Sequence, residues 1–167
     1  MVYVIVIILI AILGVTALMN RNYMKDKQEM LEGFSFVIKK EGREVALVKL
    51  EDIEKLNPIE FIESLKSSGQ KAEVNKYKGV LLRDILAARG ESLEGKSQVT
   101  IRSIDGYAVA LSAEEVGEED NVYIVYEANG EPLASKDEGG SGPYQIVIRN
   151  DPFGQRWAKF VVEVDLE

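Results

Sequence analysis

The sequence begins with an apolar run, VYVIVIILIAILGVTALM (residues 2–19), in which no residue is charged. A helix rises about 1.5 Å per residue, so this run would span roughly 27 Å, close to the hydrocarbon thickness of a bilayer. A helix on the surface of a soluble domain would show one polar face, and this run shows none. We therefore predict a transmembrane anchor over residues 1–20, which holds the rest of the chain at a membrane.

A cleaved signal peptide is the alternative interpretation of this run. Val15, Thr16 and Ala17 form a small-x-small pattern of the kind that signal peptidases cut. No Lys or Arg precedes the run, however, whereas signal peptides usually begin with basic residues. The sequence therefore favours an uncleaved anchor.

The charges that follow the run give only a weak indication of sidedness. Arg21, Lys25 and Lys27 would favour a cytoplasmic location under the positive-inside rule. Asp26 and Glu29 lie among them and weaken this pattern. The charges alone therefore leave the side of the membrane open.

The composition of the chain excludes several chemistries. Because the chain has no Cys and no His, it has no disulfide, thiolate ligand, lipoprotein anchor, imidazole base or Ser-His-Asp triad. The formal net charge of −8 argues against nucleic acid as a partner, since phosphate binding needs clustered Lys and Arg. An anionic domain is repelled by anionic lipids, so we expect it to stand off the membrane surface.

The remaining sequence predicts a polar helical continuation or tether over residues 21–33 and one domain over residues 34–167. Alternating apolar positions and turn residues predict strands at 34–40, 44–50, 59–65, 71–77, 97–104, 107–112, 121–130, 144–150 and 156–167. The dipeptides Glu41-Gly42 and Asp105-Gly106 predict hairpin turns between the strands that flank them. Short helices are predicted at 51–56, 79–90 and 113–116, the last with a capping box of Ser112 and Glu115. Many short strands with a few short helices indicate an α+β fold with antiparallel or mixed pairing.

Six stretches of the domain follow one another in a characteristic order. They are LVKLEDIEKL (47–56), YKGVLLRDIL (77–86), VTIRSIDGYAVALSAEEV (99–116), VYEANGEPL (125–133), GPYQIVI (142–148) and WAKFVVEVDL (157–166). This succession resembles the molybdopterin-binding domain of the sulfite-oxidase family. The resemblance covers roughly residues 45–166 and implies that family's fold, with molybdopterin as its cofactor.

Two positions depart from the family's pattern. In catalytic members, the strand before the Gly-Val helix ends in a Thr-Leu-x-Cys-x-Gly-Asn motif, whose cysteine ligates molybdenum. The matching stretch is SLKSSGQ (64–70), which places Ser67 at the cysteine position. A serine hydroxyl stays protonated near neutral pH and is a poorer ligand than a thiolate. The family's Gly-x-Pro-x-Arg arginine falls on Gln145, and an amide does not replace the charged fork that guanidinium offers phosphate.

The resemblance implies a pocket, although most of its positions also fit simple turns. The pocket positions are Ser67, Ser68, Gly69, Asp105, Tyr107, Gly142 and Gln145. The basic residues Arg102, Arg149, Arg156 and Lys159 are expected to pair with neighbouring acids rather than to bind an anion. Trp157 is expected to pack in the core or against Arg156 and Lys159. No metal site is expected.

Three functions fit these observations. We favour a membrane-anchored, non-catalytic relative of the family that binds a pterin-like small ligand or acts as an interaction module. The second is an accessory subunit that docks on protein partners in the membrane through its helix and acidic domain. The third is a molybdopterin-dependent oxidoreductase with an atypical site. Short anchored relatives of this kind resemble extracytoplasmic prokaryotic proteins, so we expect the domain outside the cytoplasm, on a single-pass anchor in the cell membrane.

Overall fold

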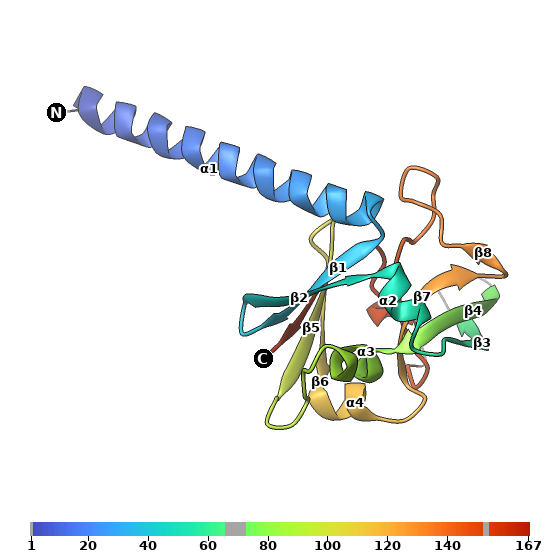
Figure 1. Ribbon diagram of the computed structural model, residues 1–167. Coiled ribbons are helices and arrows are strands. Elements are labelled where there is room, and N and C mark those ends of the chain that lie inside the picture. Colours follow the sequence, from blue (N-terminus) through green and yellow to red (C-terminus); the bar gives the residue numbers. More distant parts are fainter. Residues whose placement is uncertain (1, 66–72, 152–153) are drawn as a thin grey trace.

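The N-terminal apolar run and the polar residues after it form one continuous helix, α1 (Val2–Glu32), in the computed structural model. The structure describes residues 2–65, 73–151 and 154–167. Figure 1 shows α1 extending away from the domain, with only its C-terminal end beside the strands. Residues Tyr3–Glu32 are long and apolar enough to cross a membrane. Residues 21–32, expected as a helical continuation or a tether, are helical.

The last turns of α1 are packed against the domain. Leu31 contacts a small apolar cluster formed by Ile104, Phe160 and Val162. Lys27, one turn earlier, is buried. The helix closes at Gly33, whose N–H donates to the carbonyl of Glu29 over 2.8 Å, and the first strand begins only two residues later. α1 therefore continues almost directly into the sheet.

The described residues of the domain form two five-stranded sheets. The first has the order β2–β1–β10–β5–β6, with β2 (Arg43–Lys49), β1 (Ser35–Lys40), β10 (Val161–Leu166), β5 (Gln98–Ser103) and β6 (Ala108–Ser112). The second has the order β3–β4–β7–β8 with β9 also on β7, and comprises β3 (Ile59–Leu65), β4 (Glu73–Leu81), β7 (Val122–Ala128), β8 (Glu131–Pro132) and β9 (Gln145–Ile148). β1 and β10 pair in parallel, and the other described pairs are antiparallel. This confirms the predicted α+β fold with mixed pairing.

The helices other than α1 are short and lie beside the sheets (Figure 1). They are α2 (Leu50–Glu54), α3 (Leu82–Ala88), α4 (Ala113–Gly117) and the 3₁₀ helix η1 (Gly154–Arg156). Apolar residues of both sheets share one core cluster, so the sheets are packed into a single unit. Phe36 of β1 meets Tyr144, just before β9, edge to face at 5.3 Å between ring centroids. Such aromatic pairs add favourable geometry to the burial of apolar surface.

The predicted helix at 79–90 begins later than expected. β4 continues through Leu81, so Gly79 and Val80 lie in a strand and α3 starts at Leu82. A Cβ at Gly79 would lie 2.8 Å from the Cα of Val125 and closer still to the carbonyl oxygen of Ile124. Gly79 thus permits the close approach of β4 and β7, which extends the strand.

The predicted strand at 156–167 also starts too early. Arg156 ends η1, and β10 begins only at Val161. Phe160, directly before the strand, has a left-handed backbone with φ of 53°, which interrupts an extended conformation. Residues 156–160 therefore form a turn that positions Arg156 and Trp157 beside β9.

Candidate functional site

The seven pocket positions implied by the resemblance fall in different parts of the fold. Ser67, Ser68 and Gly69 lie outside the described residues, in the connection between β3 and β4. The flanking strands pair antiparallel as far as Leu65 and Glu73. This connection therefore joins two neighbouring strands at one end of the second sheet.

Asp105 and Tyr107 form the hairpin turn between β5 and β6, as predicted. The carboxylate of Asp105 accepts a hydrogen bond from the N–H of Tyr107 over 3.1 Å. Gly106 takes the left-handed conformation with φ of 89°, which glycine adopts without strain. Tyr107 is 46% exposed, and its hydroxyl donates to the carbonyl of Gln155 over 2.6 Å. Tyr107 therefore ties this hairpin to η1.

Gly142 and Gln145 lie in different surroundings, the first in a loop and the second in a strand. Gly142 follows the loop after β8, and a Cβ there would lie 2.7 Å from the carbonyl carbon of Leu133. Gln145 is the first residue of β9, opposite Val125, and is only 2% exposed. Gln145, which the resemblance places at the family's arginine position, is therefore a buried amide inside the sheet.

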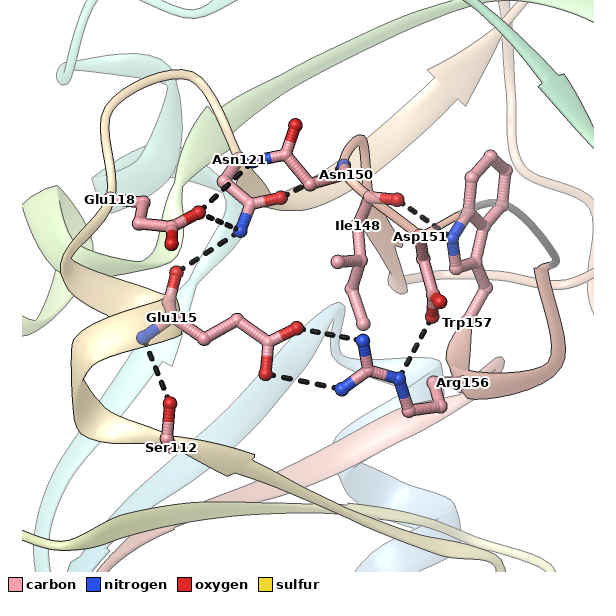
Figure 2. A network of polar contacts seen from close by, with 9 residues as sticks. All are labelled: Ser112, Glu115, Glu118, Asn121, Ile148, Asn150, Asp151, Arg156 and Trp157. Atoms are coloured by element: carbon pink, nitrogen blue, oxygen red, sulfur yellow. Dashed lines mark hydrogen bonds and ion pairs between the residues drawn. The ribbon is translucent and has the colours of Figure 1, made fainter.

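Arg156 is held by carboxylates on two sides (Figure 2). Its two terminal nitrogens donate to the carboxylate oxygens of Glu115 over 3.1 and 2.7 Å, and Nε donates to Asp151 over 2.9 Å. These hydrogen bonds, first those with Glu115 and then those with Asp151, raise the pKa of Arg156 above its usual value. The guanidinium of Arg156 is thereby paired with two acids of the protein itself, Glu115 and Asp151.

Glu115 has a different role from the one predicted. Ser112 caps α4 as expected, because its hydroxyl accepts from the N–H of Glu115 over 3.0 Å. The Glu115 side chain, however, extends to Arg156 instead of completing a capping box (Figure 2). The partner is 41 positions away in the sequence. Glu115 therefore links α4 to the turn that precedes β10.

Arg149 and Arg102 are also paired with acids. Arg149 binds Asp120 and, over 3.4 Å, Glu63, and its guanidinium carbon lies 5.3 Å from the ring centroid of Phe61. Arg102 donates to Glu163 over 2.9 Å. The expectation that these arginines pair with neighbouring acids is confirmed. Lys159 is exposed, and no ion pair is seen for it among the described residues.

Asn121 links the acidic side of this network to the loop after β9. It is fully buried and donates to Glu118 over 2.8 Å, while its carbonyl accepts from the N–H of Asn150 over 3.0 Å. Trp157 is buried too, and its indole N–H donates to the carbonyl of Ile148 over 3.1 Å (Figure 2). Its ring meets Tyr77 edge to face at 6.1 Å. Trp157 is thus a core residue, as expected.

These contacts decide whether the described residues fit a molybdenum-bound pterin. The chain has no cysteine to supply the thiolate, and Gln145, which the resemblance places at the family's arginine position, is a buried amide. Arg102, Arg149 and Arg156 already bind carboxylates, so their charge is not free for a phosphate. The described residues therefore do not fit the metal-bound cofactor.

A cleft lies elsewhere, where α1 meets the domain. It has a volume of about 480 Å³. Its walls are the end of α1, the start of the β5–β6 turn and the loop after β8, and its lining residues are Gln28, Leu31, Glu32, Phe34, Ile104, Pro132, Leu133, Ala134, Ser135, Lys136, Asp137, Glu138, Gly142 and Pro143. Of the predicted pocket positions that the structure describes, Gly142 alone lines this cleft. No local sequence pattern indicated the cleft, because three distant segments form it.

Comparison with known proteins agrees with the resemblance seen in the sequence. No curated protein matches the chain. Among solved structures, the sulfane dehydrogenase SoxCD from Paracoccus pantotrophus is similar in fold, with a TM-score of 0.62 and 20% identity. The match covers 80% of this chain and 38% of that one, so the present chain spans well under half of its length. Residues 25–167 match the model of the oxidoreductase molybdopterin binding domain, and the chain therefore belongs to this family.

Proposed function

We propose that this protein is a membrane-anchored, non-catalytic member of the family that acts as a binding or interaction module. The observation that carries the proposal is the absence of cysteine from the whole sequence. Molybdenum in the catalytic relatives is held by a thiolate, and a serine hydroxyl is a harder and weaker ligand. Without that bond, the domain keeps a fold whose original reaction it no longer performs.

The paired arginines support the same proposal. A phosphate-binding site needs guanidinium or ammonium groups that are free to meet the ligand. Arg149 and Arg156 each bind two carboxylates, so phosphate binding would first have to break these ion pairs. A neutral, pterin-like molecule without a phosphate could bind without breaking these ion pairs, and it remains the favoured small ligand.

The test is made on full-length protein extracted from its native membrane. Molybdenum and tungsten are measured by elemental mass spectrometry, and a pterin is sought by fluorescence after acid oxidation. The proposal expects no metal in the protein. A pterin without metal would identify the ligand of the module. If both pterin and metal are absent, protein partners become the expected targets. Metal and pterin near one equivalent each would contradict the proposal and favour an oxidoreductase with an atypical site.

A second candidate is an accessory subunit of a membrane complex. It is favoured by the way α1 continues into the domain, with Leu31 in an apolar cluster and Lys27 buried. Such a joint holds the domain close to one orientation above the bilayer, as docking on a neighbouring membrane protein requires. This candidate expects the protein to migrate in a larger complex after mild detergent extraction. Migration as a free chain would contradict it.

We also propose that the domain lies on the extracytoplasmic side of the cell membrane. The proposal rests on the likeness to short anchored relatives, against the weak signal of Arg21, Lys25 and Lys27. Protease added to intact cells should remove the domain if it lies outside. Protection in intact cells, with digestion after lysis, would place it in the cytoplasm.

A further inference from the structure

The cleft at the end of α1 has an apolar interior that the domain leaves open. Leu31, Phe34 and Ile104 lie on the helix side of the cleft, and Pro132, Leu133 and Pro143 on the loop side. Phe34 is 43% exposed although it is a large aromatic residue. The fold explains the position of the Phe34 backbone, because its carbonyl accepts hydrogen bonds from the Tyr144 hydroxyl and from the N–H of Leu50. The exposure of its ring has no such explanation among the described residues.

The charges around the cleft are mostly negative. Glu32, Asp137 and Glu138 contribute three carboxylates, and Lys136 contributes one ammonium group. Glu138 accepts hydrogen bonds from the hydroxyl and the N–H of Ser135, which lower its pKa and keep it ionised. Lys136 lies over the ring of Phe160, 5.7 Å from its centroid. An occupant with a positive charge is therefore favoured over an anionic one.

The height of the cleft above the bilayer argues against a lipid chain as occupant. Gln28, the first lining residue, is nine helical positions beyond Met19, the end of the apolar run. This corresponds to roughly 14 Å along the helix, or about 13 Å at an average tilt. The headgroup layer extends only about 6 Å beyond the hydrocarbon. The cleft thus opens into water, above the headgroups.

A second copy of this chain is a poor occupant as well. The chain has a net charge of −8, so another copy would bring more negative charge to a rim that is already acidic. A neighbouring membrane protein with a basic segment at this height meets none of that repulsion. Because both proteins would be confined to one membrane, their effective concentration at the cleft would be high.

We propose that the cleft binds a segment of another membrane protein, in which one or two apolar side chains are flanked by Lys or Arg. The apolar side chains would enter between Phe34 and Leu133, and the basic residues would meet Glu32 and Asp137. This inference rests on the proposed function, since it names the kind of partner that the module takes. A pterin or metal result would not decide it, so the two proposals fail separately.

The experiment places a photo-reactive residue in the cleft of the full-length chain, in its native membrane. Phe34→benzoylphenylalanine keeps an aromatic ring at the position, and Asp137→benzoylphenylalanine probes the opposite wall. Tyr107→benzoylphenylalanine is the matched control, because Tyr107 is similarly exposed but lies outside the cleft. After irradiation, we expect one polypeptide adduct from both cleft positions and none from the control. Digestion and mass spectrometry should identify a crosslinked peptide with an apolar residue flanked by Lys or Arg.

Charge reversal tests the basis of recognition. Glu32→Lys with Asp137→Lys, in the Phe34→benzoylphenylalanine background, should lower the adduct yield roughly fivefold or more, because two attractions become repulsions. Glu119→Lys makes the same kind of change at an exposed residue outside the cleft and should leave the yield unchanged. Resistance of the domain to mild proteolysis, measured for every variant, shows that it is folded. No adduct, a lipid-sized adduct, a peptide of this same chain, or an equal loss with Glu119→Lys would each overturn the proposal.

Discussion

Replacing Arg156 by methionine tests whether this arginine stabilises the fold or serves an anion. Three charge-assisted hydrogen bonds join it to Glu115 and Asp151, at 2.7 to 3.1 Å. The Arg156 side chain is 40% exposed and those of the two acids 21% and 13%, so the pairs are only partly shielded from water. Breaking a fully buried pair costs about 3–5 kcal/mol and a surface pair below about 1 kcal/mol. We therefore expect Arg156→Met to lower the free energy of unfolding by about 2 kcal/mol.

The assay is thermal unfolding of the full-length chain in detergent, followed by near-ultraviolet circular dichroism of Trp157 and the tyrosines. For a chain of this size, a loss of 2 kcal/mol lowers Tm by roughly 6 °C. Lys159→Met is the control, because Lys159 is exposed and should change Tm by less than about 2 °C. Glu115→Gln should lower Tm by about half as much as Arg156→Met. The double variant should lower Tm little more than Arg156→Met alone, since both substitutions remove the same ion pair. An unchanged or raised Tm in Arg156→Met would refute a structural role for this arginine.

Two further predictions concern the sheet. In a urea titration, Gly79→Ala should lower the free energy of unfolding by about 3 kcal/mol or more, because its Cβ would collide with the backbone of β7. Gly117→Ala is the control, because its Cβ would meet only a side-chain carbon of Leu93 at 3.7 Å, and it should change the free energy of unfolding by less than about 1 kcal/mol. Equal losses in the two variants would contradict this prediction. Burial, and then the hydrogen bond to Asp120, raise the pKa of Tyr123 to about 12. Because the pKa of Tyr123 is higher in the folded than in the unfolded state, the contribution of its protonated hydroxyl to stability is complete below about pH 10. This contribution is lost as the pH rises through the folded-state pKa. Between about pH 8 and pH 11, the free energy of unfolding of Tyr123→Phe should therefore fall by roughly 1 kcal/mol less than that of the wild type. Identical decreases in the two proteins would contradict the raised pKa of Tyr123.

Local patterns were sufficient to predict most of the elements. The hairpins β1–β2 and β5–β6 were predicted because Glu41-Gly42 and Asp105-Gly106 are turn dipeptides between alternating strands. The start of α3 was misplaced because Gly79, Val80 and Leu81 fit a helical stripe as well as a strand. Only the approach of β7 to Gly79 decides between the two, and that contact joins residues far apart in the sequence.

The site was harder to predict than the fold. The resemblance indicated which family the chain belongs to, and the missing cysteine was visible in the composition. The partners of the arginines were expected only as neighbouring acids, and the pairing of Arg156 with Glu115 depends on the turn before β10. The cleft is formed by α1, the β5–β6 turn and the loop after β8, which no local pattern brings together.

The most direct test of the proposed function is the metal content of the wild type and of Ser67→Cys, both purified from native membranes. Among the described residues, Arg102, Arg149 and Arg156 are paired with acids, and the chain has no cysteine of its own. We therefore predict less than about one tenth of an equivalent of molybdenum or tungsten in either protein. Near-stoichiometric metal in the wild type would contradict the proposal that the chain is non-catalytic. Metal only in Ser67→Cys would show that the thiolate alone was missing, and would contradict the conclusion that the remaining residues do not fit the cofactor.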